Sequence, residues 1–254
     1  MIQYLFAGNE PEDHMSDKVN RTELVLTLRA AARAELAANQ PVAALGLAMQ
    51  AFELDADDPE TLSFVDGLVS GVSDADSLLA VDADSPSLFR RALRARVMAN
   101  VGRRIEATRA MIGVIERAPH RPFIAWLASW LDEEACRVIG IEGLKQLILS
   151  LAEFATQYSV PPPDVCLPML RAGATLLSTV RRVYPDERQL YSAEVLIRRR
   201  LSDPERTLHV AQLGIERFPD DWGCLNAMAT ALEDSGRAKD ALDYANRARA
   251  VDPP

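Results

Sequence analysis

The chain has 254 residues, a net charge of -9 and only 6% aromatic residues. An acidic balance of this size disfavours a general nucleic-acid binder, which usually carries a basic surface, and no apolar run approaches the roughly 20 residues that span a bilayer. Cys136, Cys166 and Cys224 lie far apart without a Cys-x-x-Cys pair, so neither a disulfide framework nor a zinc site is expected, and we predict a cytoplasmic protein.

The amino-terminal segment, residues 1–22, is predicted to be a disordered tail or a remnant added by cloning. It is acidic, contains a proline and lacks the basic and apolar regions of a signal peptide. Beyond it the sequence is rich in Ala, Leu and Arg and has no long β-branched runs, so intrinsic propensity favours helix almost everywhere. The chain is therefore predicted to be all-α.

Pairs of amphipathic helices are predicted from Val25 to residue 121. The first pair turns at residues 39–41, and its second helix aligns Ala44, Ala48 and Ala51 on one face. An acidic phrase with a proline closes two successive units, at residues 54–59 and 81–86, and the second unit is seven residues shorter than the usual period. Its second helix is therefore predicted to be short, at residues 77–81. A third pair turns at Gly102 and closes at Pro119.

Residues 122–187 depart from this pattern and predict three helices. The first contains Trp126 and ends near Gly140, the second covers residues 141–158 and the third covers residues 168–183. Asp132-Glu133-Glu134 is interpreted as the solvated face of the first helix. Three prolines at 161–163 end any helical continuation, so a weak joint is expected there, between segments 23–158 and 164–254 of one continuous solenoid.

The last part of the chain has a fixed period. Pro185, Pro219 and Pro253 stand at equal intervals along the sequence, and each follows an amphipathic helix. The final segment resembles the tetratricopeptide repeat, with Gly236 in the turn and Ala241 and Ala248 on the second helix, and the interval between the prolines equals the period of that family. The resemblance implies a right-handed α-solenoid of roughly five helix-turn-helix units with an irregular middle.

No catalytic constellation is found in the sequence. None of the three histidines has a second His or Cys at ligand spacing, and the Gly71-Val72-Ser73 segment lacks the preceding strand and the closing glycine of a nucleophile elbow. The Asp82-Ala83-Asp84 phrase repeats Asp55-Ala56-Asp57 at a unit boundary and is interpreted as punctuation between repeats. There is no glycine-rich phosphate loop. We predict no enzymatic activity, no cofactor and no metal.

The resemblance to tetratricopeptide repeats also implies a concave groove that binds peptides. On the family pattern the candidate groove residues are Arg29, Arg33, Arg90, Arg94, Arg199, Arg200, Asn226 and Thr230. The alternative is that the arginines solvate exposed faces or pair with acidic residues of neighbouring repeats. If they line the groove, reversing the charge of Arg29 and Arg90 should abolish binding and leave thermal stability nearly unchanged.

The predicted function is a non-catalytic scaffold that binds a partner protein or peptide, with an acidic segment or a free C-terminus as the possible ligand, and no nucleic acid or membrane. The alternative is a substrate-recruiting arm of a larger enzyme, such as a bacterial glycosyltransferase, in a chain that continues past Pro254. Tyr244 and Val251 are expected to remain available to a following helix, whereas Leu242 packs inward. Self-association through this edge is therefore a further expectation.

Overall fold

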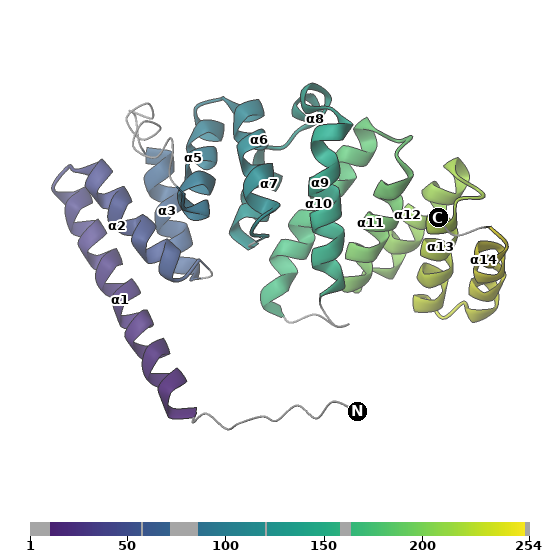
Figure 1. Ribbon diagram of the computed structural model, residues 1–254, viewed down its shortest axis with the longest axis horizontal. Coiled ribbons are helices and arrows are strands. Elements are labelled where there is room, and N and C mark those ends of the chain that lie inside the picture. The colour runs from purple at the N-terminus through teal and green to yellow at the C-terminus, as the bar shows by residue number, and fades with distance from the viewer. Residues whose placement is uncertain (1–10, 57, 72–85, 120, 158–163, 252–254) are drawn as a thin grey trace. The chain divides into compact units, whose positions relative to one another are not determined.

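The computed structural model describes residues 11–56, 58–71, 86–119, 121–157 and 164–251. Every regular element in these ranges is a helix (Figure 1), and within each unit most successive helices pack on one another as in an α-solenoid, which confirms the predicted fold class. The chain divides into two compact units, Met1–Asp74 and Ala75–Pro254, here called unit 1 and unit 2. Each unit is described by itself.

Unit 1 contains the helices α1 (Pro11–Ala37), α2 (Pro41–Leu54) and α3 (Pro59–Gly71). A proline stands at the first position of each, where its fixed φ suits a helix start and its missing N–H costs nothing. The helices α1 and α2 pack closely because Ala32, Ala44 and Ala48, which line their contact, are fully buried. The turn between them is closed by Asn39 at φ 60°, a left-handed conformation that asparagine adopts more readily than most residues.

The tail predicted over residues 1–22 is corrected from Pro11 onward, because α1 begins there. Pro11 stands at the first position of α1, where its fixed φ suits a helix start. No further proline or glycine interrupts the segment before Val25. Residues 1–10 lie outside the described residues.

Unit 2 opens with the helical hairpin of α5 (Leu88–Asn100) and α6 (Arg104–Ile115). The Ser87 hydroxyl caps α5 by accepting a hydrogen bond from the backbone N–H of Arg90. Gly102 turns the chain at φ 86°, in the left-handed region that favours glycine, which confirms the predicted turn. The short helix predicted at residues 77–81 lies outside the described residues.

The described part of the middle of unit 2 contains four helices where three were predicted. They are α7 (Arg121–Trp130), α8 (Glu133–Ile139), α9 (Ile141–Thr156) and α10 (Leu167–Val183), with a short 3-10 turn at Asp164–Cys166 before α10. The predicted first helix ends at Trp130 because the Asp132 carboxylate accepts a hydrogen bond from the Ala135 N–H at 2.8 Å and starts a new helix. Asp132 is thus an N-cap and not part of a solvated helix face.

The expected joint at the three prolines falls on residues 158–163, which lie outside the described residues. The predicted segment limits at 158 and 164 therefore stay predictions, and both positions fall within unit 2.

Gly140 makes a sharp connection between α8 and α9. Its φ of 80° ends α8 and lets α9 begin at the next residue.

The carboxy-terminal part of unit 2 contains α11 (Arg188–Arg200), α12 (Pro204–Arg217), α13 (Trp222–Asp234) and α14 (Ala238–Ala250). The first residues of α11 and α13 are separated by the same interval as those of α12 and α14, and this interval equals the spacing of the prolines in the sequence. The carboxylates of Asp203 and Asp221 cap α12 and α13. The period of the sequence therefore corresponds to a repeat of helix pairs.

The apolar residues at the end of the chain differ in part from the prediction. Leu242 is 58% exposed, so the prediction that it packs inward is wrong. Tyr244 and Val251 are partly buried against the core cluster of α11–α14, and their availability to a following helix stays a prediction. The buried face of α14 is formed by the small residues Ala241 and Ala248, which leave room beside them for Tyr244. Self-association through this edge stays a prediction.

No helix among the described residues combines the length and the apolar character needed to cross a bilayer.

Candidate protein-binding surface

The helices α11 and α13 expose the same face. In each, the exposed or partly exposed positions recur every third or fourth residue, and the positions of one helix match those of the other after a shift by one repeat. In α11 they are Arg188, Gln189, Ser192, Leu196, Arg199 and Arg200, and in α13 they are Trp222, Gly223, Asn226, Thr230, Glu233 and Asp234. Most of the residues between them are buried.

The helix α9 lies on the other side of α11, and we infer that its exposed stripe extends this surface. Both helices contact α11, and α9 exposes Gln146, Leu149 and Glu153 along one stripe. Leu149 is 52% exposed and Trp222 is 41% exposed, so large apolar side chains are present on both flanks of α11. We call this the α9–α11–α13 surface and define it by its outward residues: Gln146, Leu149, Glu153, Gln189, Ser192, Leu196, Trp222, Asn226 and Thr230.

Arginines of α11 hold the three helices of this surface together. Arg199 donates two hydrogen bonds to the Asp234 carboxylate of α13, at 2.5 and 3.1 Å, and Arg188 pairs with Asp221 at 3.1 Å. On the other side, the Nε of Arg200 donates to the carbonyl oxygen of Ala155 in α9 at 2.8 Å. Two predicted ligand-binding residues, Arg199 and Arg200, therefore bridge neighbouring helices, as in the alternative interpretation of the arginines.

A pocket of about 520 Å³ opens where α11 and α13 begin. Its lining combines apolar and charged residues from α11, α12, α13 and the segments that follow α12 and α14: Arg188, Gln189, Ser192, Arg217, Phe218, Pro219, Asp220, Asp221, Trp222, Gly223 and Val251. Phe218 stacks edge-on against Tyr191 at 5.7 Å and so belongs to the core below. The pocket gives the α9–α11–α13 surface a recess beside Trp222.

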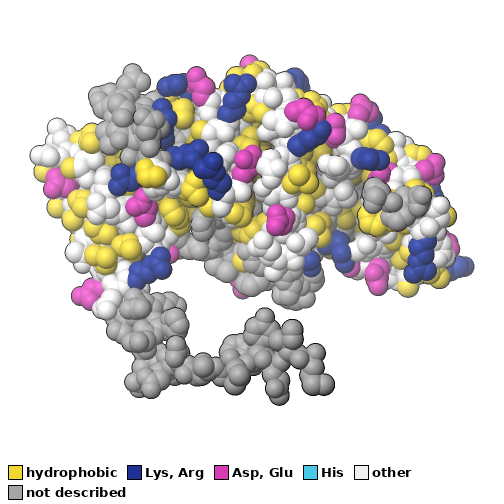
Figure 2. Space-filling view, viewed as in Figure 1, with side chains coloured by type: hydrophobic (Ala, Val, Ile, Leu, Met, Phe, Trp, Pro, Cys, Tyr) yellow, Lys and Arg dark blue, Asp and Glu magenta, His cyan; other side chains and the backbone are white. Residues whose placement is uncertain are grey.

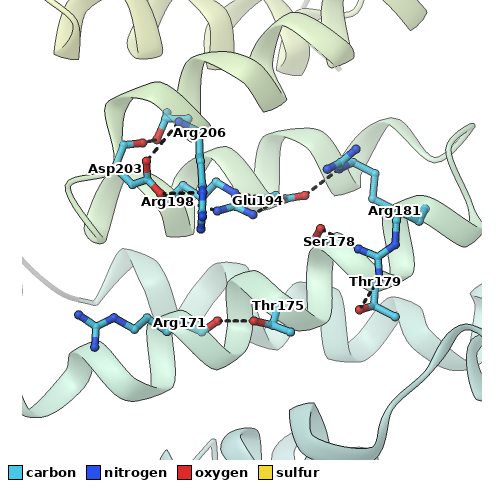
Figure 3. Close-up of polar contacts among 11 residues, drawn as sticks. Arg171, Thr175, Ser178, Thr179, Arg181, Glu194, Arg198, Asp203 and Arg206 are labelled. Atoms are coloured by element: carbon cyan, nitrogen blue, oxygen red, sulfur yellow. Dashed lines mark hydrogen bonds and ion pairs between the residues drawn. The ribbon is translucent and has the colours of Figure 1, made fainter.

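A buried charge cluster lies beneath the surface, between α10 and α11 (Figure 3). The Glu194 carboxylate is fully buried and accepts hydrogen bonds from Arg181 Nε at 2.7 Å and from Arg198 Nε at 2.8 Å. Arg181 also lies over the Tyr191 ring at 5.6 Å. Both oxygens of Glu194 are thus satisfied by guanidinium groups, which fixes the back of α11 against α10.

The two candidate residues of unit 1 have different environments. Arg29 is only 4% exposed, and its guanidinium forms ion pairs with Asp58 and Glu60 at the start of α3. Arg33, one turn later, is exposed and lies over the Phe64 ring at 5.6 Å. Arg29 is therefore engaged in holding α1 against α3, whereas Arg33 remains accessible.

Asp58 is the centre of the contact with Arg29. Burial raises its pKa, but hydrogen bonds from the hydroxyl and N–H groups of Thr61 and from Arg29 outweigh burial, so the pKa of Asp58 lies below its ordinary value of 3.8. A carboxylate whose pKa is lowered by folding stabilises the fold above its unfolded pKa, and this contribution is lost as the pH falls through the folded pKa.

We therefore expect the stability of unit 1 to stay constant from neutral pH to about pH 4 and to fall below it. Thermal melts followed by far-ultraviolet circular dichroism across this range test the prediction. In an Asp58→Asn variant the carboxylate is absent, so the part of the acid sensitivity that Asp58 causes should disappear. An unchanged acid profile in the variant would show that other carboxylates are responsible.

Two further candidate arginines of unit 2, Arg90 and Arg94, lie on α5. They are one turn apart and partly exposed, and both also have contacts within the chain. Asn226 and Thr230 lie on the α9–α11–α13 surface, where the Thr230 hydroxyl donates to the Asn226 carbonyl oxygen at 2.7 Å. The structure thus brings Arg199, Arg200, Asn226 and Thr230 to adjacent helices and places Arg90 and Arg94 on a different helix of the same unit.

Sequence reasoning missed the apolar members of this surface, which are Leu149, Leu196 and Trp222. A signal for Leu196 was present, because a shift by one repeat relates it to the candidate residue Thr230. Leu149 could not be found in this way, since α9 lies outside the regular repeat.

The three cysteines are buried. Burial raises the pKa of the Cys136 thiol to about 11 and that of the Cys224 thiol to about 12, so neither is a thiolate at neutral pH. In the ranges that the structure describes, no group of three or more His, Cys, Asp and Glu residues is placed to hold a metal ion.

These features define an all-α repeat fold with a mixed apolar and amide surface. No protein-family model and no curated protein matches the chain. Solved structures of MamA are similar at low levels. A mutant form has 13% identity and a TM-score of 0.36 over 93% of this chain and 99% of that chain, and MamA MSR-1 has 12% and 0.38 over 89% and 95%. A likeness this distant carries no information about partner or function.

Proposed function

We propose that the chain is a non-catalytic scaffold of tetratricopeptide type that holds a partner protein against the α9–α11–α13 surface. The observation that carries this proposal is the recurrence of one exposed face on α11 and α13, one repeat apart in the sequence. Stacked helix pairs that repeat one face build an extended surface, and extended surfaces of this kind bind long segments of other proteins.

The chemistry of the surface supports a protein ligand. Trp222, Leu149 and Leu196 offer apolar contact area, while Gln189, Asn226 and Ser192 offer hydrogen-bonding groups between them. Interfaces combine buried aromatic and apolar anchors with a polar rim. The ion pairs of Arg188 and Arg199 lie at the two ends of α11, so the charged groups border the centre of the surface.

The surface is also held in shape before a partner arrives. Arg199 and Arg200 join α11 to both neighbouring helices, and Glu194 fixes α11 from behind. A surface that does not have to be ordered on binding loses less conformational entropy, so more of the contact energy appears as affinity.

A pair of matched double variants tests the proposal. Leu149→Asp with Trp222→Asp places two charges on the surface, and we expect at least a tenfold loss of recovered partner, because a desolvated charge without a counterion opposes binding. Val138→Asp with Leu242→Asp makes the same change at residues that are 50% and 58% exposed on α8 and α14, and it should leave recovery unchanged.

Affinity capture from cells that express the protein, with quantitative mass spectrometry of all three forms, provides the comparison. Circular dichroism melts must agree among the three forms, so that loss of binding is separated from loss of fold. Equal recovery by the wild type and the surface variant would place the partner elsewhere and reject the proposal.

A further inference from the structure

Positive charge is concentrated in the segment of this acidic chain that contains the α5–α6 hairpin. Between Leu88 and Arg121 there are nine arginines, two glutamates and no other charged residue, a net charge of +7. The whole chain has a net charge of -9, so the remaining residues sum to -16. A local excess of one sign in a chain of the opposite sign marks this hairpin as a candidate interaction surface.

Four of the nine arginines lie on α5. Arg103 and Arg104, which precede and begin α6, pair with Glu106 at 2.7 Å and with Asp132 at 3.2 Å, so their charge is largely balanced. The helix α5 has no acidic residue and contains Arg90, Arg91, Arg94 and Arg96, all partly exposed. We call Arg90, Arg91 and Arg94, which lie on one side of α5, the arginine face of α5; Arg96 lies on the opposite side of the helix. In Figure 2 the largest group of Lys and Arg side chains lies over α5.

Arg96 is held in place by residues of the neighbouring helix α7. Arg96 donates a hydrogen bond to the Ser129 hydroxyl at 3.0 Å, and its guanidinium lies over the Trp130 ring at 5.6 Å. Arg90, Arg94 and Arg96 also take part in further contacts within the chain. A guanidinium has five N–H donors, so an arginine held by one contact can still donate to a second partner, and the first contact reduces the entropy lost on binding.

We propose that the arginine face of α5 binds a short run of aspartate and glutamate residues within a partner protein. The proposal rests on the proposed scaffold function and adds a second contact and its chemistry. Planar guanidinium groups pair with carboxylates through two parallel hydrogen bonds. Three of them on one side of a helix match several carboxylates in sequence better than a single C-terminal carboxylate.

The charge of the rest of the chain favours a short acidic segment over a nucleic acid. Electrostatic interactions in water are screened over roughly 8 Å at physiological salt, so a short segment is influenced mainly by the arginines that it contacts. A long polyanion would also pass over surfaces that belong to the remaining net charge of -16, and these would repel it.

The test uses fluorescence anisotropy with a labelled peptide of alternating aspartate and glutamate and an amidated C-terminus. We expect binding that weakens with added salt and is absent for the matching asparagine and glutamine peptide. Replacing Arg90, Arg91 and Arg94 together by glutamine should weaken binding about tenfold, since three charge-assisted contacts are removed. A control that replaces Arg237, Lys239 and Arg249 by glutamine removes the same charge at exposed positions around α14 and should change binding less than about threefold.

Because Arg90 and Arg94 have contacts within the chain, an Arg91→Gln single variant is measured in parallel, and each variant must melt like the wild type. Equal binding by the α5 variants and the α14 control would overturn the proposal. It would equally be overturned if only a peptide with a free C-terminus bound, or if single-stranded DNA bound as tightly as the acidic peptide. The scaffold function fails separately, through the Leu149 and Trp222 variant, which leaves α5 intact.

Discussion

Replacing Glu194 by alanine is expected to lower the free energy of unfolding of unit 2 by about 3–5 kcal/mol. The side chains of Arg181 and Arg198 are 14% and 12% exposed, and Glu194 is their common counterion. Without it two guanidinium groups remain largely buried close together, and only Arg198 keeps an acidic neighbour, Asp203 at 4.0 Å, so most of the cost of their desolvation is no longer compensated. The measurement is urea unfolding followed by tryptophan fluorescence, which reports on unit 2 alone because Trp126, Trp130 and Trp222 all lie in it.

A triple variant separates the pair energy from the cost of stranding a charge. Changing Arg181 and Arg198 to methionine together with Glu194→Leu removes all three charges, and it should cost far less than the single variant or even stabilise the unit. If Glu194→Ala lowered stability by less than about 1 kcal/mol, the two arginines would have to be solvated, which their burial contradicts.

Reversing the charge of Arg29 is expected to unfold unit 1. Arg29→Glu places a carboxylate at a position that is 4% exposed, next to Asp58 and Glu60, and it removes the ion pairs between α1 and α3. Breaking a buried pair costs about 3–5 kcal/mol, and like-charge repulsion adds to it. We expect a loss of helical signal in circular dichroism, while the tryptophan transition of unit 2 stays in place.

Arg33→Glu is the matched control for this change. It makes the same substitution one turn later on α1, but Arg33 is exposed and only lies over the Phe64 ring, so the cost should be below about 1 kcal/mol. The sequence predicted that, if these arginines line the groove, reversing Arg29 and Arg90 together would leave thermal stability nearly unchanged. Equal stability of the two variants would restore that prediction and remove the structural role assigned to Arg29.

The repeat fold could be predicted because its signal is periodic. Prolines at equal intervals and small residues at fixed positions recur whenever each unit must stack on the next. The end of the Trp126 helix was missed, although Asp132 followed by Glu133 and Glu134 is a typical helix start. The uninterrupted apolar spacing up to Leu131 favoured one continuous helix, whereas the N-cap at Asp132 begins a second helix.

The candidate site was harder to predict because ion pairs depend on distant residues. Arg29 and Asp58 are 29 positions apart, and Arg199 and Asp234 are 35 apart, so the sequence could not show that the arginines are engaged. Asn226 and Thr230 were predicted from their positions in the family pattern alone, and both lie on the proposed surface. Leu149 became a candidate only when packing placed α9 beside α11.

Photo-crosslinking tests the central claim, that partners bind across α9, α11 and α13, most directly. A photoreactive amino acid is placed at Asn226 or Gln189 on the surface, or at Gln212, which is exposed on α12, and adducts with the captured partner are compared. If the partner binds across these three helices, adducts form from Asn226 and Gln189 and none form from Gln212. Adducts from Gln212, with none from the two surface positions, would contradict it.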